Sequence, residues 1–98
     1  MQIIAELSII PLGVGLSLSK YIAECERILK NKGLKIQLHA EGTNIEGEYD
    51  QVMGAIKMCI ESVHKLGSPR IVTNVKISSR TDKTETMAQR IQSVENKS

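Results

Sequence analysis

The feature that most constrains this 98-residue chain is a repeated switch between two hydrophobic periods. Apolar residues recur at every second position in four segments, a spacing typical of strands; these lie at about residues 2–10, 34–41, 43–48 and 70–78. Other segments place apolar residues three and four apart, as amphipathic helices do; these lie at about residues 17–31, 50–66 and 84–95. The predicted order is therefore βαββαβ followed by a last helix.

This order is that of the ferredoxin-like arrangement. Each predicted strand has only one fully apolar face, so we expect an α+β fold in which both main helices cover one face of a four-stranded antiparallel sheet. The opposite face would carry a mixture of polar and aliphatic side chains: Ile4, Glu6, Ser8, Ile10, Gln37, His39, Val72, Asn74 and Lys76. Because exposed aliphatic groups of this number favour burial, we expect the chain to self-associate through this face.

Several single residues indicate where the elements begin and turn. Gly42 is predicted to take a positive φ at a tight hairpin between the second and third strands. Asp50 is a predicted cap of the second helix, and Ser17 or Ser19 of the first, because these side chains accept backbone N–H bonds. Gly54, inside the second helix, is expected to allow close contact between helix and sheet.

Composition excludes several classes of protein. With 41% hydrophobic and 24% charged residues, residues 1–98 are predicted to form one globular domain. The net charge of +2 is too small for a nucleic-acid binder, and no segment is long and apolar enough for a membrane span. Cys25 and Cys59 have the spacing of helix-core residues, so we expect buried free thiols in the reducing cytoplasm.

No catalytic arrangement is evident. The chain has no Ser/His/Asp or Cys/His set, and His39 and His64 are expected too far apart to share a metal. An acylphosphatase would need a glycine-rich loop with an arginine after the first strand, which is missing. An RNA-recognition module would need aromatic residues on its strands, and none precedes Tyr49. We therefore expect a binding protein that is not an enzyme and has no metal or cofactor.

The chain resembles the thiamine-binding protein family (YkoF-like) over nearly its whole length. The resemblance is carried by two separated blocks, residues 42–53 (Gly-Thr-Asn-Ile-Glu-Gly-Glu-Tyr-Asp-Gln-Val-Met) and residues 80–83 (Arg-Thr-Asp-Lys). Smaller matches support it: Pro11-Leu12-Gly13, Ser19, His64 before Gly67, and Arg70 before Thr73. One departure is Tyr49, where the family often has Trp.

The resemblance implies a function as well as a fold. It implies a cytoplasmic homotetramer, assembled as a dimer of dimers, that binds thiamine or its hydroxymethylpyrimidine moiety without turnover. An alternative is a structural or regulatory oligomer that senses another small metabolite. A site for thiamine needs a carboxylate, a hydroxyl or amide group, and an apolar wall.

Each group needed for thiamine has sequence candidates around the predicted hairpin. The carboxylate is Glu46 or Glu6, and the polar contacts are Thr43 and Asn74. The wall is Ile45 or Tyr49, and the helix start at Ser17–Ser19 would close the pocket.

These candidates also have structural interpretations. Glu46 could be a solvated hairpin acid, and Thr43 a hydroxyl that bonds only its neighbours in the turn. Glu6 could form an ion pair with Lys76 or His39 across the sheet. For Arg80, Asp82 and Lys83, the favoured prediction is an ion cluster that anchors the last helix, and the second interpretation is a phosphate contact.

Overall fold

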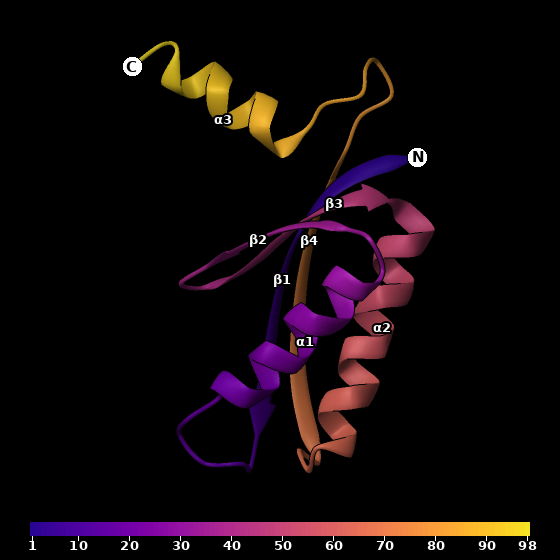
Figure 1. Ribbon diagram of the computed structural model, residues 1–98, viewed down its shortest axis with the longest axis vertical. Coiled ribbons are helices and arrows are strands. Elements are labelled where there is room, and N and C mark those ends of the chain that lie inside the picture. The colour runs from indigo at the N-terminus through magenta and orange to yellow at the C-terminus, as the bar shows by residue number, and fades with distance from the viewer.

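The structure, a computed structural model, describes residues 1–98 and confirms the ferredoxin-like arrangement (Figure 1). Four strands form one antiparallel sheet in the order β2-β3-β1-β4. The elements are β1 (Gln2–Leu12), α1 (Ser19–Asn31), β2 (Lys35–His39), β3 (Gly42–Glu48), α2 (Tyr49–Lys65), β4 (Arg70–Ser79) and α3 (Met87–Glu95). All seven lie within four residues of the predicted ranges.

The hydrophobic core lies between the sheet and the pair α1 and α2, which run side by side over one face (Figure 1). This inner face is formed by alternate residues of the strands, as the period of two predicts. Members of the core include Ile3, Ala5, Leu7 and Ile9 of β1, Ile45 of β3, Leu29 of α1, and Val52, Ile56, Cys59 and Val63 of α2. With no Phe or Trp in the chain, branched aliphatic residues fill this space.

The predicted caps of both main helices are wrong. The N-cap of α2 is Glu48, whose Oε2 accepts the N–H groups of Asp50 at 2.8 Å and Gln51 at 3.3 Å. Asp50 instead lies inside the first turn, where its charge suits the helix dipole. The N-cap of α1 is Leu18, and no side chain caps this helix. Ser17 and Ser19 lie exposed, with their hydroxyl oxygens 3.4 Å apart.

The predictions for two glycines are also wrong. Gly42 has no positive φ. A Cβ there would stand 2.8 Å from the carbonyl oxygen of Leu7, so Gly42 is required by the close approach of β1 and β3. Gly54 is exposed and a Cβ there would meet nothing within 4 Å, so it makes no close contact with the sheet.

The outer face of the sheet is partly covered by α3. The backbone N–H of Met87, the first residue of α3, donates to Glu46 Oε1 at 2.6 Å. Figure 1 shows α3 at the end of the molecule opposite to the β1–α1 and α2–β4 loops. The longest helix, α2, has 17 residues, and no helix combines the length and the hydropathy needed to cross a bilayer.

Both cysteines are buried and free, as predicted. The Sγ of Cys59 lies 3.7 Å from the carbonyl oxygen of Cys25, where α1 packs on α2. Contact with Cys25 and burial both raise the pKa of Cys59, so this thiol stays protonated. No group of three or more His, Cys, Asp or Glu side chains could hold a metal ion.

Candidate functional site

A largely apolar cavity of about 290 Å³ lies between α1, the β2–β3 hairpin and the adjoining edge of β1. We call it the hairpin pocket. Its apolar walls are formed mainly by Leu18 and Ile22 from α1 and its N-cap, Ile9 and Ile10 from β1, and Leu38 from the hairpin. The pocket opens where β3 stops pairing with β1, after the Leu7–Thr43 pair. The last five residues of β1 therefore have a neighbouring strand on one side only.

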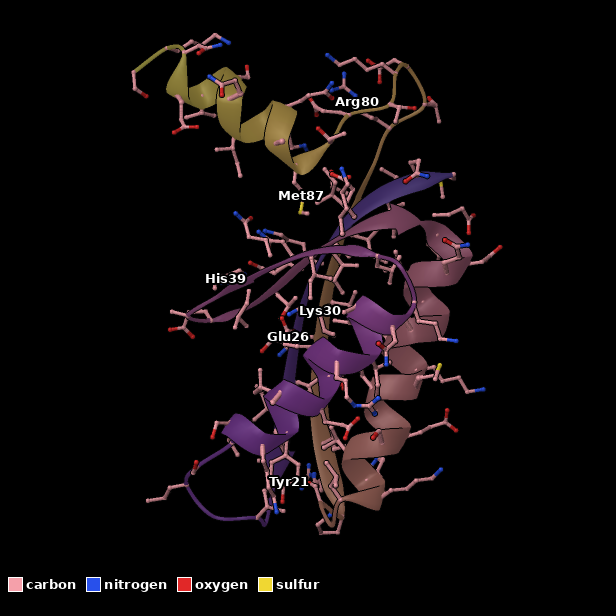
Figure 2. All side chains as sticks on the ribbon, in the orientation of Figure 1. Tyr21, Glu26, Lys30, His39, Arg80 and Met87 are labelled. Atoms are coloured by element: carbon pink, nitrogen blue, oxygen red, sulfur yellow. The ribbon has the colours of Figure 1, made fainter.

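The polar centre of the hairpin pocket is a contact between Glu26 and Thr43. The Thr43 hydroxyl donates to Glu26 Oε2 at 2.8 Å, and Thr43 is only 5% exposed. Glu26 lies on α1 one turn after Ile22, so the helix directs its carboxylate toward the hairpin. Figure 2 shows Glu26 on α1 beside the hairpin that carries His39. A carboxylate has about four acceptor sites, and Thr43 uses one of them.

His39 lies at the tip of the hairpin, above Gly42. A Cβ at Gly42 would stand 3.4 Å from the imidazole ring, so glycine leaves room for it. The backbone N–H of Glu41 donates to His39 Nδ1 at 3.3 Å, which places the proton of the neutral ring on Nε2. That Nε2 lies 3.4 Å from Glu6 Oε2 without making a hydrogen bond.

The structure places the predicted site residues on two faces of the sheet. Thr43 and Ile45 point to the inner face, whereas Glu46 points to the outer face. Thr43 lines the hairpin pocket, but Ile45 is fully buried in the core and reaches no cavity surface. Glu46 bonds the start of α3. Thr43 and Glu46 therefore do not share one pocket.

The other predicted residues lie around the hairpin pocket or away from it. Ser19 borders a shallow hollow on the exposed side of Glu26, while Ser17 lines neither of these cavities. Glu6 is on the outer face, where Lys76 Nζ lies 3.8 Å from its Oε1. This contact confirms the predicted pairing of Glu6 with Lys76 across the sheet, and His39 Nε2 lies near the other carboxylate oxygen of Glu6. Asn74 is exposed on the outer face of β4.

Sequence reasoning missed Glu26 as a site residue. The sequence does contain a sign of its role, because Glu26 falls one turn after Ile22 and next to Cys25, inside the apolar stripe of α1. A charged residue at such a position either snorkels to water or meets a polar partner. Finding that partner needed the tertiary structure, since Thr43 is 17 residues away.

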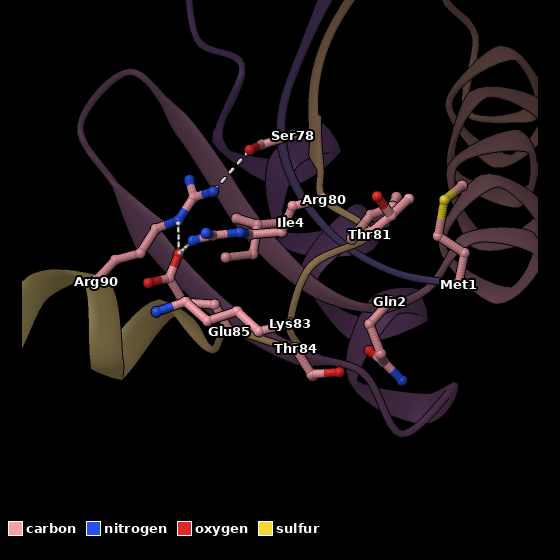
Figure 3. Close-up of a pocket in the computed structure, with 11 residues that line it drawn as sticks. Met1, Gln2, Ile4, Ser78, Arg80, Thr81, Lys83, Thr84, Glu85 and Arg90 are labelled. Carbon is pink, nitrogen blue, oxygen red and sulfur yellow. Dashed lines mark hydrogen bonds and ion pairs between the residues drawn. The ribbon is translucent and has the colours of Figure 1, made fainter.

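A second cavity, of about 420 Å³, lies between the N-terminal end of β1 and the loop that joins β4 to α3 (Figure 3). We call it the loop pocket. Arg80 binds Asp82 through Nε at 2.8 Å and Nη2 at 2.5 Å, and its Nη1 lies 3.3 Å from Glu85 Oε1. Arg90 donates to the same Glu85 oxygen from Nε at 3.0 Å and to Ser78 Oγ from Nη2 at 2.7 Å.

These contacts confirm the predicted ion cluster at the base of α3 for Arg80 and Asp82, but Lys83 makes no ion pair, and Glu85 and Arg90 complete the cluster instead. The Arg80 bond holds the pKa of Asp82 at about 2, below its ordinary 3.8. The bond from Arg90, reinforced by Arg80, lowers the pKa of Glu85. Both carboxylates are therefore ionised at neutral pH, and Glu85 joins the loop to the helix through two arginines.

Relatives that align with nearly the whole of this chain are known. A UPF0045 protein of Synechocystis is 47% identical over 95 residues, which are 97% of this chain and 78% of the relative. A UPF0045 protein of Methanocaldococcus jannaschii is 36% identical over 95% of this chain and 92% of its own.

Solved structures agree in fold. The crystal structure of a hypothetical protein of Methanocaldococcus jannaschii matches with a TM-score of 0.90 and 35% identity, and it covers 96% of both chains. That of a candidate thiamine biosynthesis or salvage protein of Thermotoga maritima matches with a TM-score of 0.83, over 96% of this chain and 99% of that one. At 16% identity, this second likeness supports the fold alone.

The family model described as "Thiamine-binding protein" matches residues 5–95, nearly the whole of the chain. That range includes the hairpin pocket, the loop between β4 and α3, and α3 itself. By this match and by its relatives, the chain belongs to the thiamine-binding protein family.

Proposed function

We propose that this protein binds thiamine or its hydroxymethylpyrimidine moiety in the hairpin pocket, and releases it unchanged. The family supports a small-molecule ligand, and the name of the Thermotoga neighbour points in the same direction. The observation that carries the proposal is the Glu26–Thr43 contact at 2.8 Å, inside walls that are mostly aliphatic. The contact supplies the carboxylate and the hydroxyl group that an aminopyrimidine requires, and the aliphatic lining supplies the apolar wall.

The chemistry of thiamine suits this arrangement. Its aminopyrimidine carries an amino group that donates and ring nitrogens that accept, while its thiazolium carries a fixed positive charge. Glu26 would accept from the amino group, and the Thr43 hydroxyl would stay hydrogen-bonded to the carboxylate and hold it in place. Leu18, Ile22 and Leu38 would contact the faces of the ring.

The size of the hairpin pocket indicates how the ligand would lie. About 290 Å³ is at the lower end of the range for small-molecule sites, roughly 300–1,000 Å³. We therefore place the pyrimidine inside and the thiazolium at the mouth, where Glu41 provides a second negative charge. The pyrimidine moiety alone would then retain most of the affinity.

Two matched variants test the site. A hydrogen bond to a charged group contributes about 1.5–3 kcal/mol, so Glu26→Gln should weaken thiamine binding about tenfold or more. Glu46→Gln makes the same chemical change on the outer face, where the amide oxygen can still accept from Met87. It should leave affinity unchanged, although the sequence alone favoured Glu46 as the carboxylate.

Calorimetric titration with thiamine and with hydroxymethylpyrimidine, and circular dichroism as the control for folding, would separate these outcomes. A tenfold loss in Glu46→Gln alone would move the site to the outer face. No binding of either compound by the parent protein would contradict the proposal. It would favour the alternative, a structural or regulatory oligomer that senses another small metabolite.

We further propose a homotetramer, built as a dimer of dimers, in the cytoplasm. Three aliphatic side chains at the uncovered end of the outer face support association: Ile10 and Leu12 are each 37% exposed, and Val72 is 41% exposed. Ile10 and Val72 are direct cross-strand partners, so they form one continuous patch. Free buried thiols suit a reducing compartment.

Ile10→Glu would place a charge in that interface and should dissociate the assembly. Sedimentation velocity at micromolar concentration would show it as a shift to smaller species. Gln51→Glu offers a control, because it adds the same charge on the exposed side of α2, away from the outer face. A parent protein that sediments as a monomer would contradict the tetramer.

A further inference from the structure

The free edge of β1 inside the hairpin pocket carries backbone groups that the rest of the fold does not use. Pairing of β1 with β3 ends at Leu7 and Thr43, whereas its pairing with β4 continues to Leu12. Figure 1 shows the β2–β3 hairpin turning away from the line of β1. Residues 8–12 therefore have an open edge on this side, and residues 8–10 line the hairpin pocket.

Three contacts establish which residues of β1 direct their backbone toward the hairpin side. Successive residues of a strand point their N–H and C=O groups to alternate sides. The carbonyl oxygen of Met1 accepts at 2.8 Å from the first N–H after β3, and that of Leu7 lies against Gly42. The carbonyl oxygen of Leu12 accepts instead from a serine hydroxyl just before β4. Odd-numbered residues thus face β3, and the next of them after Leu7 is Ile9.

The backbone of Ile9 has no partner on the hairpin side. In a continued ladder it would pair with Glu41, but the Glu41 N–H donates to His39 Nδ1 instead. No turn or loop residue bonds the backbone of Ile9 either. Ile9 is only 5% exposed, so its N–H and C=O form a buried donor and acceptor in the pocket wall. Buried backbone groups are nearly always paired, so an unpaired set in a cavity indicates a place for a ligand.

This edge suits a small ring better than a peptide strand. Pro11, the next residue that faces the hairpin side, has no N–H, so Ile9 alone offers both a donor and an acceptor. The space beside it, about 290 Å³, is near the lower limit for small-molecule sites. A single planar ring fits this space and needs only one residue's backbone for a pair of hydrogen bonds.

A ring nitrogen beside an amino group matches the Ile9 pair. The nitrogen accepts from the N–H and the amino group donates to the C=O, just as the groups of a neighbouring strand would. The aminopyrimidine of thiamine has this arrangement at one edge. Its amino group carries two hydrogens, so one can go to Ile9 and the other to Glu26, which lines the same pocket.

An oxo group in place of the amino group reverses this pattern. The carbonyl oxygen of the ligand would then face the Ile9 C=O, and a ring N–H would face the Ile9 N–H. Both contacts are repulsive, and all four groups would be left without hydrogen bonds.

We propose that the backbone of Ile9 selects the ligand: its N–H donates to the ring nitrogen beside the amino group, and its C=O accepts from that amino group. The hairpin pocket thus takes aminopyrimidines and rejects their oxo counterparts. This proposal rests on the proposed function in using the hairpin pocket as the ligand site, but it specifies a class of ligand and not thiamine alone.

NMR titrations with 4-aminopyrimidine, hydroxymethylpyrimidine and the 4-oxo counterpart of hydroxymethylpyrimidine test the selection. With both amino compounds we expect a large shift of the Ile9 amide resonance and slower hydrogen exchange there. A coupling through the hydrogen bond should join the amide nitrogen of Ile9 to the ring nitrogen of an isotopically labelled ligand. The oxo compound should bind about a hundredfold more weakly than hydroxymethylpyrimidine.

Replacing the Ile9 amide by an ester removes the N–H and keeps the core side chain. A synthetic segment of residues 1–24 that carries the ester can be joined to residues 25–98 by ligation at Cys25. Affinity for hydroxymethylpyrimidine should fall about two- to tenfold, as expected for one neutral hydrogen bond. An ester at Leu16, an exposed loop residue whose N–H makes no backbone bond, is the control in the same segment and should leave affinity unchanged.

The outcomes separate this proposal from the one on which it rests. Binding of hydroxymethylpyrimidine with an unmoved Ile9 amide, equal affinity for the oxo compound, or equal effects of the two esters would overturn the role of Ile9 and leave the proposed function standing. If 4-aminopyrimidine moves the Ile9 amide while thiamine and hydroxymethylpyrimidine do not bind, the role of Ile9 holds and the proposed ligand fails. No binding of any of these compounds overturns both. An Ile9 amide protected from exchange without ligand would indicate a strand of a second copy at this edge, and would overturn the role of Ile9 in selection.

Discussion

The hairpin pocket and the loop pocket are built in opposite ways on one sheet. In the hairpin pocket, a strand and a helix hold an apolar cavity with a single carboxylate–hydroxyl contact, Glu26–Thr43. In the loop pocket, an irregular segment and the start of α3 are held by four charged side chains, Arg80, Asp82, Glu85 and Arg90. The first depends on packing against the core, the second on ion pairs exposed to solvent.

This difference determines how each pocket responds to perturbation. Packing in a close-packed interior changes abruptly when a side chain is removed or added. Exposed ion pairs contribute little each and are weakened by salt and by acid. Changes in the core should therefore affect both pockets, changes in the hairpin only the first, and changes in α3 or in pH mainly the second.

The largest effect should come from Ile45→Ala. Ile45 is fully buried between β1, β2 and the helices, and removal of a buried Ile side chain costs about 2–5 kcal/mol. Denaturant unfolding of the variant should show this loss in the free energy of unfolding, and ligand binding in the hairpin pocket should weaken. Unchanged stability would mean that β3 is not part of the shared core.

Gly42→Ala should affect the hairpin pocket alone. Its Cβ would stand 2.8 Å from the Leu7 carbonyl oxygen, so β3 must shift away from β1 at the pocket's edge. Such overpacking costs about 1–3 kcal/mol. Binding in the hairpin pocket should weaken, while the ion pairs of the loop pocket should persist. Gly54→Ala is the matched control, because a Cβ there meets nothing.

Thr86→Ala should loosen the loop pocket. Thr86 and Gln89 form a capping box at the start of α3, with bonds of 3.1 Å and 2.9 Å. Loss of such a cap costs about 0.5–2 kcal/mol of helix stability. Since α3 has no buried residue, hydrogen exchange should report faster opening of α3 and little change in β1 or α2. Equal acceleration across the sheet would contradict this separation.

The same contrast explains which features the sequence could predict. Periodicity identified all the elements and both faces of β1, because each alternate residue from Ile3 to Ile9 must reach the core. It also located the hairpin around Gly42 and Thr43, which line the first pocket. Local patterns are sufficient wherever burial of apolar surface decides the conformation.

Contacts between distant segments were beyond such patterns. Glu26 meets Thr43 only through the packing of α1 on the hairpin, and Glu46 meets Met87 only because α3 folds back on the outer face. The cap of α2 depended on a choice between two neighbouring acids, Glu48 and Asp50, which have the same side-chain chemistry. The backbone φ and ψ at Glu48, and not its residue type, decide that choice.

The smallest expected effect is a dependence of the loop pocket on acid and salt. Arg80 lowers the pKa of folded Asp82 from 3.8 to about 2, so folding favours the ionised carboxylate. The contribution is thus fully present above about pH 4 and is lost as pH falls toward 2. A carbon-detected NMR titration should give the low pKa in the parent protein, and 1 M NaCl should raise it by screening. Arg80→Gln should return it toward 3.8. An ordinary pKa in the parent would contradict the Arg80–Asp82 pair, and with it the support that holds the loop pocket.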